Sequence, residues 1–406
     1  MKPFFDLNKF INQNITHRTE SLLEEDCQNF NQELSERIDN KSVLVIGGAG
    51  TIGSFFIKAI LKYKPSKLYV FDINENGLTE LVRDLRSSPG YNIPKDFITY
   101  PINFGDKVFE KILRKEKGFD IVANFAAHKH VRSEKDAFSV EAMIENNVLK
   151  AKKLLDLLLE FPPERFFCVS TDKAANPVNL MGASKKLMEE VILAYSTHIP
   201  ITTARFANVA FSNGSLLQGF IERLAKKQPL SAPSDVKRYF VSPQESGQLC
   251  LLACILGNSG EIFFPKLDAQ KDTHTFAEIA VLFLKEQGLE ADICASEDEA
   301  RQKEISLVGE TPQYPAYFFK SDTSGEKSYE EFFTDSEITD LNTFKALGVV
   351  KNAPKKDLKE IELIFEKLNT LFDSPEFDKE AIVKLMTSII PNFKHIETGK
   401  NLDQKM

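Results

Sequence analysis

From residue 42 onward the chain alternates short apolar runs with helical stretches, and this alternation restricts the fold more than any other feature. Segments with helical periodicity separate the apolar runs, which read as strands. A β-α-β-α succession predicts a Rossmann-type, doubly wound parallel sheet with helices on both faces. The predicted strands cover residues 43–46, 67–71, 97–102, 121–125, 166–169 and 201–206, and the helices cover 51–63, 75–87, 106–117, 136–160 and 182–197.

The alternation becomes irregular beyond about residue 210, which is typical of a smaller substrate-binding lobe. We therefore expect four parts, with some later segments returning to the Rossmann domain. They are an N-terminal helical extension (1–40), an NAD-binding Rossmann domain (41–210), a substrate-binding lobe (211–350), and C-terminal helices at 354–373 and 377–389 with a tail (351–406).

The N-terminal extension contains one predicted amphipathic helix. Ser21 and Glu24 have the spacing of a capping box, and apolar residues recur at 23, 27, 30, 34 and 38. We expect this helix to pack on its own domain or on a second subunit. Membrane-surface binding is the alternative, but the polar face has no excess of lysine and arginine.

Composition excludes several classes of protein. The net charge of −8 argues against nucleic acid as the main partner. The five cysteines and six histidines show no paired metal-ligand spacing, so we expect no metal and reduced thiols. No stretch reads as a secretory leader or approaches the roughly 18 apolar residues of a membrane span. A soluble, cytoplasmic protein is expected.

A glycine-rich turn follows the first predicted strand and opens a helix. Gly47, Gly50 and Gly53 have a spacing that resembles that of extended short-chain dehydrogenases. The first glycine permits a tight turn, the second lets the backbone approach a pyrophosphate, and the third lets helix and strand pack closely. The pyrophosphate would lie at the helix N-terminus, so Thr51 and Ile52 are expected at the cofactor as well.

The ends of the following strands complete the predicted cofactor site. Asp72 ends the second strand, where a carboxylate takes ribose hydroxyls and repels a 2′-phosphate, which favours NAD over NADP. Asp72 could instead cap the helix that begins after Asn74. Asn103 ends the third strand near the expected adenine. Ala126 and Ala127 follow the fourth strand and leave room for the dinucleotide.

Residues 169–185 carry the most informative chemistry. Asp172 and Lys173 place an acid and an amine side by side after Thr171, just beyond a predicted strand. Met181 stands four positions before Lys185, where a short-chain dehydrogenase would have the tyrosine of Tyr-x-x-x-Lys. Adjacent strand residues face opposite sides, so the pair serves one site only if the chain has turned. The pair could also be a solvated ion pair, and Met181 could be ordinary core packing.

Further motifs resemble those of one group of enzymes, the nucleotide-sugar 4,6-dehydratases of polysaccharide biosynthesis. This group belongs to the extended short-chain dehydrogenase/reductase family. The resemblance covers about residues 42–335 and is greatest to UDP-N-acetylglucosamine 4,6-dehydratases. Besides the 171–185 segment, the motifs are Asn124-Phe-Ala-Ala-His-Lys-His-Val131, Asn146-Asn-Val-Leu149, Arg205-Phe-Ala-Asn208, Ser212-Asn-Gly-Ser215, Arg238-Tyr-Phe240 and Gly325-Glu-Lys-Ser-Tyr-Glu-Glu331.

The resemblance implies elimination of water from a hexose. Oxidation of C4 makes the C5 proton acidic, a base removes it, an acid protonates the departing C6 hydroxyl, and the stored hydride returns to C6. Lys173 is the expected base if its pKa is depressed, and Asp172 the acid if its pKa is raised. Thr171 is expected to bond the C4 oxygen and Lys185 the nicotinamide ribose. Asn147 resembles the structural asparagine of this family.

The resemblance also implies a UDP-sugar substrate and its contacts. Arg205 and Arg238 are candidates for the diphosphate, because guanidinium groups suit bidentate phosphate contacts, although each could be a structural ion pair. Lys129 and His130 are expected to shape the substrate pocket. The other expected contacts come from Asn208, Ser215 and Glu326. Two departures from the family pattern, at Arg132 and Thr323, affect nucleotide recognition, and Arg132 or Lys320 could compensate.

Met181 decides the expected stereochemistry at C5. The resemblance implies that tyrosine here accompanies inversion and methionine retention, and a thioether has no proton to transfer. The expected product is UDP-2-acetamido-2,6-dideoxy-α-D-xylo-hexos-4-ulose. A nucleotide-sugar 4-epimerase or reductase is the alternative, and an NAD-sensing protein with a decayed site is a third. A homodimer through helices beside the cofactor lobe, or a larger homo-oligomer, is expected.

Overall fold

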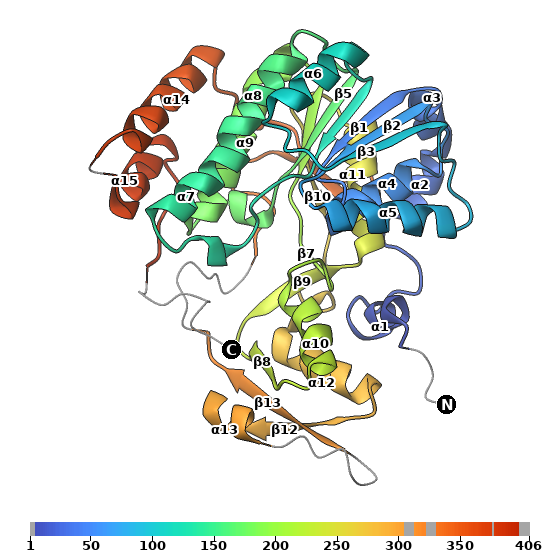
Figure 1. Ribbon diagram of the computed structural model, residues 1–406, viewed down its shortest axis with the longest axis vertical. Coiled ribbons are helices and arrows are strands. Elements are labelled where there is room, and N and C mark those ends of the chain that lie inside the picture. The colour runs from blue at the N-terminus through green and yellow to red at the C-terminus, as the bar shows by residue number, and fades with distance from the viewer. Residues whose placement is uncertain (1–4, 304–311, 322–329, 376, 398–406) are drawn as a thin grey trace.

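The computed structural model describes residues 5–303, 312–321, 330–375 and 377–397 (Figure 1). Its largest sheet has nine strands among these residues, and neighbours from β3 to β10 run parallel. This confirms the Rossmann-type fold. In spatial order the strands are β14 (Thr339–Asp340), β15 (Leu347–Val350), β10 (Ile262–Pro265), β6 (Ile201–Ala204), β5 (Arg165–Val169), β4 (Ile121–Asn124), β1 (Ser42–Ile46), β2 (Lys67–Phe71) and β3 (Asp96–Tyr100).

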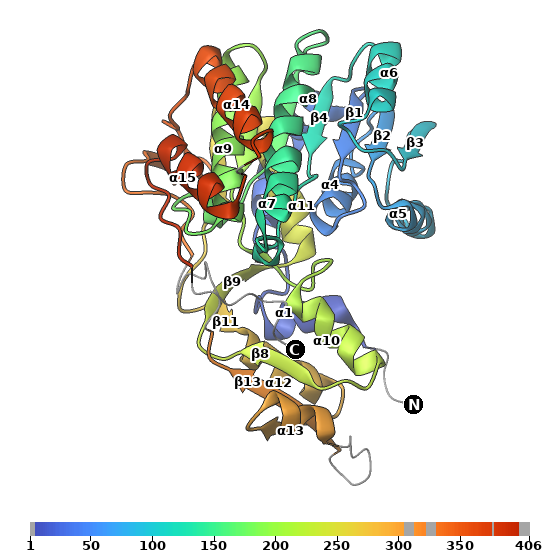
Figure 2. The same cartoon turned by 60° about the vertical axis from the view of Figure 1, so that its left-hand side comes forward.

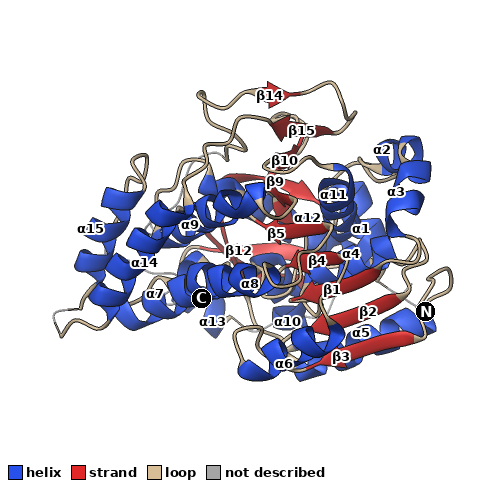
Figure 3. Ribbon diagram, turned by 90° about the horizontal axis from the view of Figure 1, so that it is seen from above, coloured by secondary structure: helices blue, strands red, loops and turns tan. Residues whose placement is uncertain are grey.

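Helices cover both faces of this sheet, as Figure 3 shows from above. Alternate residues of β1 enter two separate cores: Leu44 and Ile46 pack in one, Val43 and Val45 in the other. The first core includes α6 (Lys107–Glu116), α7 (Ala137–Ile144), α8 (Lys150–Leu158) and α9 (Leu180–Ala194). The second includes α4 (Thr51–Ile60), α5 (Glu75–Ser87) and α11 (Pro243–Leu256). Because both faces are buried, the strands read as continuous apolar runs.

A smaller lobe lies below the main sheet in Figure 1. It contains two three-stranded sheets and a core in which Phe211, Phe220 and Phe283 pack together. One sheet is β11 (Thr273–Thr275), β9 (Lys237–Val241) and β7 (Asn208–Val209), and the other is β12 (Glu290–Cys294), β13 (Gln313–Phe319) and β8 (Leu230–Pro233). The helices are α10 (Leu216–Ala225), α12 (Phe276–Glu286) and α13 (Glu297–Gln302).

Part of the segment 211–350 belongs to the Rossmann layer instead of this lobe. Helix α11 packs on α4, and β10, β14 and β15 extend the main sheet. The expected second lobe is therefore divided between the two parts of the molecule. Strands β14 and β15 are antiparallel additions, which the β-α-β pattern does not predict.

The N-terminal extension packs along both lobes of its own chain. Helix α1 (Leu7–Asn14) buries Phe10 and Ile11 in the core of the smaller lobe, whereas α3 (Asn31–Ile38) packs against α11. Between them, Arg18 bonds Glu245 of α11 at 2.8 Å and Asp272 of the smaller lobe at 2.5 Å. Residues 7–38 thus join the two lobes.

The prediction of one continuous helix over residues 23–38 is wrong. The structure has α2 (Glu24–Asn29) and α3, which meet at Phe30. The predicted capping box is absent, because the Ser21 hydroxyl accepts from the Leu23 amide and donates to Gln248 instead of capping at Glu24. Leu23, Leu34 and Ile38 are buried in the chain's own core. The extension therefore packs on its own domain, which is one of the two packing arrangements expected from the sequence.

The C-terminal helices cover one face of the Rossmann domain. Helix α14 (Leu358–Phe372) and α15 (Lys379–Ile389) lie beside α7 and α9 in Figures 1 and 2. Lys152 of α8 also pairs with Glu362 of α14 at 2.8 Å. Among the helices beside the cofactor lobe, α7 and α9 are therefore in contact with C-terminal helices of the same chain. In the described parts of the chain, no helix has both the length and the apolarity needed to cross a membrane.

Candidate active site

The glycine-rich turn is held by close backbone contacts that only glycine allows at two of its three positions. Gly47 has φ +75°, and a Cβ there would lie 2.5 Å from the Ala126 amide nitrogen. A Cβ on Gly53 would lie 2.3 Å from the Gly47 carbonyl oxygen. A Cβ on Gly50 would lie 3.4 Å from the nearest atom, the Gly47 carbonyl oxygen, so the protein itself leaves room for a side chain there. The open space at Gly50 therefore suits a group from outside the chain, at the N-terminus of α4.

Asp72 ties the end of β2 to this turn. Its two carboxylate oxygens accept from the Ala49 amide at 3.0 Å and the Asn74 amide at 2.9 Å. The cap of α5 is Asn74, whose side chain accepts from the Gly77 amide, so Asp72 is not the helix cap. Asp72 remains partly exposed and has the position that a ribose-binding carboxylate needs.

The other predicted cofactor residues lie along the same edge, at the carboxyl ends of β3 and β4. Asn103 accepts from the Gly105 amide, and Asn124 accepts from the Ala126 amide, which shapes the turn before Ala127. Ala126 and Ala127 are partly exposed. Thr51 accepts from the Asn213 amide at 2.8 Å, while Ile52 packs between the two cores. The residues present thus form a shaped edge that fits a dinucleotide.

The chain turns immediately after β5 and brings Asp172 and Lys173 together. A 3-10 turn over Asp172–Ala174 ends the extended backbone at Thr171. The Lys173 ammonium nitrogen lies 3.1 Å from both Asp172 oxygens, and the Thr171 hydroxyl donates to Asp172 at 2.7 Å. Asp172 is only 4% exposed, so the pair is not a solvated surface ion pair. The condition that both side chains reach one site is met.

The expected depression of the Lys173 pKa is not present. Burial lowers this pKa, but the negative charges of Asp172 and Glu330 together outweigh burial and raise it. Glu330 lies 3.7 Å from the Lys173 nitrogen. In the free protein Lys173 is therefore an ammonium group, and it must lose a proton before it can act as a base.

Helix α9 begins against this turn. Its cap Asn179 accepts from the Gly182 amide at 2.7 Å, and a Cβ on Gly182 would lie 2.7 Å from the Lys173 carbonyl oxygen. The glycine thus allows α9 to approach the turn closely. Met181 and Lys185 are both buried, at 2% and 3% exposure. Met181 also belongs to the main apolar core.

Lys185 differs from Lys173 in its surroundings. Its ammonium donates to the Val169 carbonyl at 2.6 Å, and burial lowers its pKa. Behind it, Asn147 lies in a π-helical turn over Glu145–Leu149 and donates to the His128 carbonyl and the Ser184 hydroxyl. Asn147 therefore connects the loop after β4 to α9.

The predicted substrate residues lie in different surroundings. Asn208 donates to Glu330 at 2.6 Å, and the Arg238 Nε lies 3.6 Å from the same carboxylate, so both adjoin Lys173. Lys129 donates to the Asn213 carbonyl at 2.8 Å. His130 is exposed beside Gly214, and Ser215 caps α10. Arg132 and Lys320 are exposed, and Glu326 and Thr323 lie outside the described residues.

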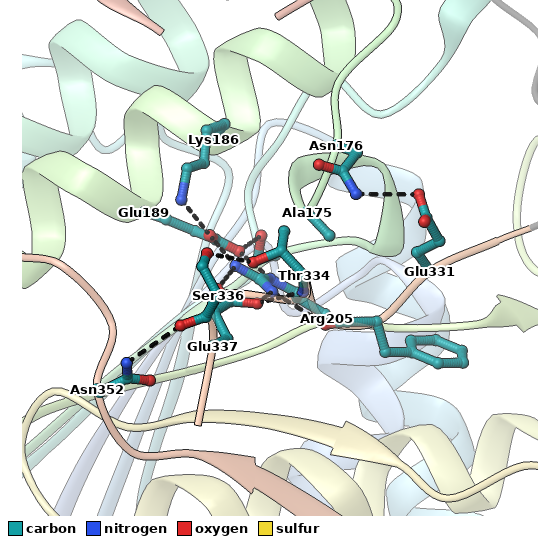
Figure 4. Close-up of polar contacts among 12 residues, drawn as sticks. Ala175, Asn176, Lys186, Glu189, Arg205, Glu331, Thr334, Ser336, Glu337 and Asn352 are labelled. Atoms are coloured by element: carbon teal, nitrogen blue, oxygen red, sulfur yellow. Dashed lines mark hydrogen bonds and ion pairs between the residues drawn. The ribbon is translucent and has the colours of Figure 1, made fainter. Parts of the chain in front are cut away.

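Arg205 does not serve the substrate, and this expectation is corrected. Its side chain is 0% exposed and its five N–H groups are all engaged (Figure 4). They donate to both oxygens of Glu189, both oxygens of Glu337 and the Phe332 carbonyl, at 2.8–3.0 Å. Arg205 is therefore a structural ion pair that joins α9 to the segment before β14.

Sequence reasoning missed two features of the site. Glu330 stands in the sequence only as one member of the Gly325–Glu331 motif, yet it is buried against Lys173. The C-terminal segment also holds the loop that precedes α9: the Lys394 and Ile396 amides donate to the Pro177 and Val178 carbonyls at 3.1 and 3.0 Å. Asn392 donates to the Ala175 carbonyl at 2.9 Å. No motif in the sequence marks this segment.

Glu134 connects the same C-terminal segment to α9. It accepts from the Leu180 amide at 2.7 Å and bonds His395 at 2.5 Å. Glu397 also lies nearby, but the Lys379 ammonium contacts both carboxylates, at 3.4 and 2.7 Å. Lys379 thus provides a cation of the chain itself for both carboxylates.

Comparison with known proteins gives the family. Residues 43–352 match the family described as "Polysaccharide biosynthesis protein". The chain belongs to this family. The resemblance inferred from the motifs is thereby confirmed, and the chain is an extended short-chain dehydrogenase/reductase of the polysaccharide biosynthesis group.

Individual relatives share less than 30% sequence identity with the chain. The chain is 29% identical over 88% of its length to an uncharacterised membrane protein of Methanocaldococcus jannaschii, of which it covers 98%. It is 28% identical over 58% of its length to a UDP-N-acetylglucosamine 4,6-dehydratase (inverting) of Campylobacter jejuni, of which it covers 70%. It spans about half of two longer polysaccharide biosynthesis proteins, from Staphylococcus aureus and Bacillus subtilis (54% and 49%).

Solved structures support the fold. A dTDP-glucose 4,6-dehydratase from Streptomyces venezuelae, solved with NAD bound, superposes with a TM-score of 0.53 at 18% identity. The match covers 71% of this chain and 87% of that one. At this identity the likeness concerns the fold alone.

Proposed function

We propose that this protein is an NAD-dependent nucleotide-sugar 4,6-dehydratase that acts on UDP-N-acetylglucosamine. The observation that carries the proposal is the buried Asp172–Lys173 pair, which lies against the first turn of α9 where methionine replaces the usual phenol. Transfer of one proton from the Lys173 ammonium to the Asp172 carboxylate gives a carboxylic acid and a neutral amine, the acid and the base that elimination requires. The dehydratase among the relatives acts, by its name, on the same substrate.

The cofactor edge supports NAD. When bound, NAD supplies the hydride acceptor for C4 and the hydride donor for C6. The open space at Gly50 would hold the pyrophosphate, Asp72 the adenosine ribose, and Lys185 the nicotinamide ribose. Because the hydride returns to the same sugar, no external oxidant is consumed.

The residues of the catalytic turn would move the protons. Lys173 first passes a proton to the Asp172 carboxylate that it contacts, and the neutral amine then takes the C5 proton. The protonated Asp172 gives its proton to the departing C6 hydroxyl, which leaves as water. Met181 has no transferable proton, so Lys173 returns the proton to the face from which it came. We therefore propose retention at C5 and the xylo-hexos-4-ulose product, although the named relative is an inverting enzyme.

Mass analysis tests the proposal. The protein is incubated with UDP-N-acetylglucosamine without added NAD, and a sugar that has lost one water supports the dehydratase. The 29% identity to a UDP-glucose 4-epimerase of Rickettsia typhi makes epimerisation the second candidate. A product of unchanged mass whose proton NMR coupling constants differ from those of the substrate would establish that alternative. A sugar with unchanged mass and unchanged NMR spectrum would reject both.

A further inference from the structure

Glu330 is a buried carboxylate that the dehydration steps leave without a role. It is 8% exposed, and its two oxygens are held from three elements. One oxygen accepts from Asn208 at 2.6 Å and lies 3.7 Å from the Lys173 nitrogen, and the other accepts from the Tyr239 amide at 3.0 Å. These contacts fix its position between the smaller lobe and the catalytic turn.

The charges around Lys173 alternate in sign. Among the described residues, the charged groups that act on the Lys173 amine are Asp172 on the turn, Arg238 on β9, and Glu330. Arg238 lies 3.6 Å from Glu330 and repels Lys173, whereas both carboxylates attract it. Asp172 cannot by itself set the protonation of the Lys173 amine, because Asp172 is also the expected acid and changes its own charge. Glu330 is the second carboxylate beside this amine, and it takes part in no proton transfer of the dehydration.

We propose that Glu330 is a positioning residue that holds the Lys173 amine and controls whether this amine carries a proton. The proposal rests on the dehydratase function, in which Lys173 must change its protonation state during turnover. A carboxylate within 4 Å favours the ammonium form, and its neutralisation releases the proton more easily. Burial and the negative charge of Asp172 raise the pKa of Glu330 to about 7, so its own charge is sensitive to conditions near neutrality.

The test measures the protonation of Lys173 directly. The full-length protein is pulsed with acetic anhydride at a series of pH values up to about 12, because the Lys173 pKa lies above the ordinary lysine value of about 10.4. Acetylation of Lys173 is quantified by peptide mass spectrometry. Only the neutral amine reacts, and the exposed Lys226 serves as an internal reference. For Glu330→Gln we expect the Lys173 midpoint to fall by about 1 pH unit or more, because one attracting charge is lost.

Two matched variants make the result specific. Glu330→Asp keeps the charge and is expected to stay nearer to the wild-type midpoint than Glu330→Gln. Glu331→Gln removes the neighbouring carboxylate, which bonds Asn176 instead of Lys173, and is expected to leave the midpoint unchanged. An unchanged midpoint in Glu330→Gln, or equal shifts in all three variants, would overturn the proposal. Dehydration is measured separately on the wild-type protein, so failure of the proposed function is distinguished from failure of this inference.

Discussion

The two halves of the site are built in different ways. The cofactor half depends on backbone approach: Gly47 and Gly53 are fixed by contacts with atoms less than 3 Å from a hypothetical Cβ. The catalytic half depends on charges that come from distant parts of the chain, among them Lys173, Arg238 and Glu330. The difference teaches that added volume should disturb the cofactor half first, whereas a change of charge should disturb the half that contains Lys173 first.

The largest expected effect comes from removing a charge in the catalytic half. Asp172→Asn keeps the size of the side chain but removes the acid, so dehydration should fall about 100-fold or more, the usual scale of general acid catalysis. Lys173→Met should abolish exchange of the C5 proton with solvent. NAD binding, measured by titration calorimetry, should persist in both variants. Wild-type turnover in either would show that the pair is not catalytic.

The glycine turn should respond to size instead of charge. Gly53→Ala places a Cβ 2.3 Å from the Gly47 carbonyl oxygen, so both NAD affinity and melting temperature should fall. Gly50→Ala meets no protein atom closer than 3.4 Å and should weaken NAD binding while the melting temperature stays near that of the wild type. Titration calorimetry and thermal melting separate the two effects.

Gly219→Ala is the matched control for these glycine variants. Gly219 lies in α10, and a Cβ added there would have no other atom within 4 Å, so the substitution should leave NAD binding unchanged. Helix propensity favours alanine by up to about 1 kcal/mol at such a position. If Gly50→Ala bound NAD as tightly as Gly219→Ala, the pyrophosphate would not lie at this turn.

A smaller effect is expected from the C-terminal brace. His395→Ala removes the bond to Glu134, which in turn holds the first amide of α9. The free energy of unfolding should fall by about 1.5–3 kcal/mol, the range for a hydrogen bond to a charged group. Chemical denaturation measures this change. His198→Ala, at an exposed histidine outside the site, is the control and should have little effect.

Much of this architecture could be predicted because it is local. The six strands from 43 to 206 and the glycine turn follow from apolar runs and from spacing between near neighbours in the chain. The sequence could not show that Arg205 is buried, since its partners Glu189 and Glu337 are brought to it only by folding. The role of Glu330 is hidden for the same reason. Glu330 is far from Lys173 in the sequence, so no local sequence pattern predicts that its charge acts on this amine.

The same limit explains why the sequence could state the condition for Lys173 to act as a base, a lowered pKa, but could not show that this condition is not met in the free protein. Adjacent acid and amine residues indicate a catalytic pair, but the sign of the pKa shift depends on every charge that surrounds the amine. Burial alone would lower this pKa, as it does for Lys185, and two carboxylates reverse the outcome. Residue identity therefore predicts the members of the site, and only the packed structure predicts their protonation.

The most direct test of the account is the reaction of UDP-N-acetylglucosamine in deuterium oxide, followed by proton NMR and mass spectrometry. The Asp172–Lys173 pair should exchange the C5 proton with solvent, and the hydride from C4 should return to C6 without dilution. The account predicts loss of one water, one deuterium at C5, none at C6, and coupling constants of the xylo isomer. An L-arabino product as the first species would contradict retention at C5. A product that has lost no water and carries no deuterium at C5 would contradict dehydration itself.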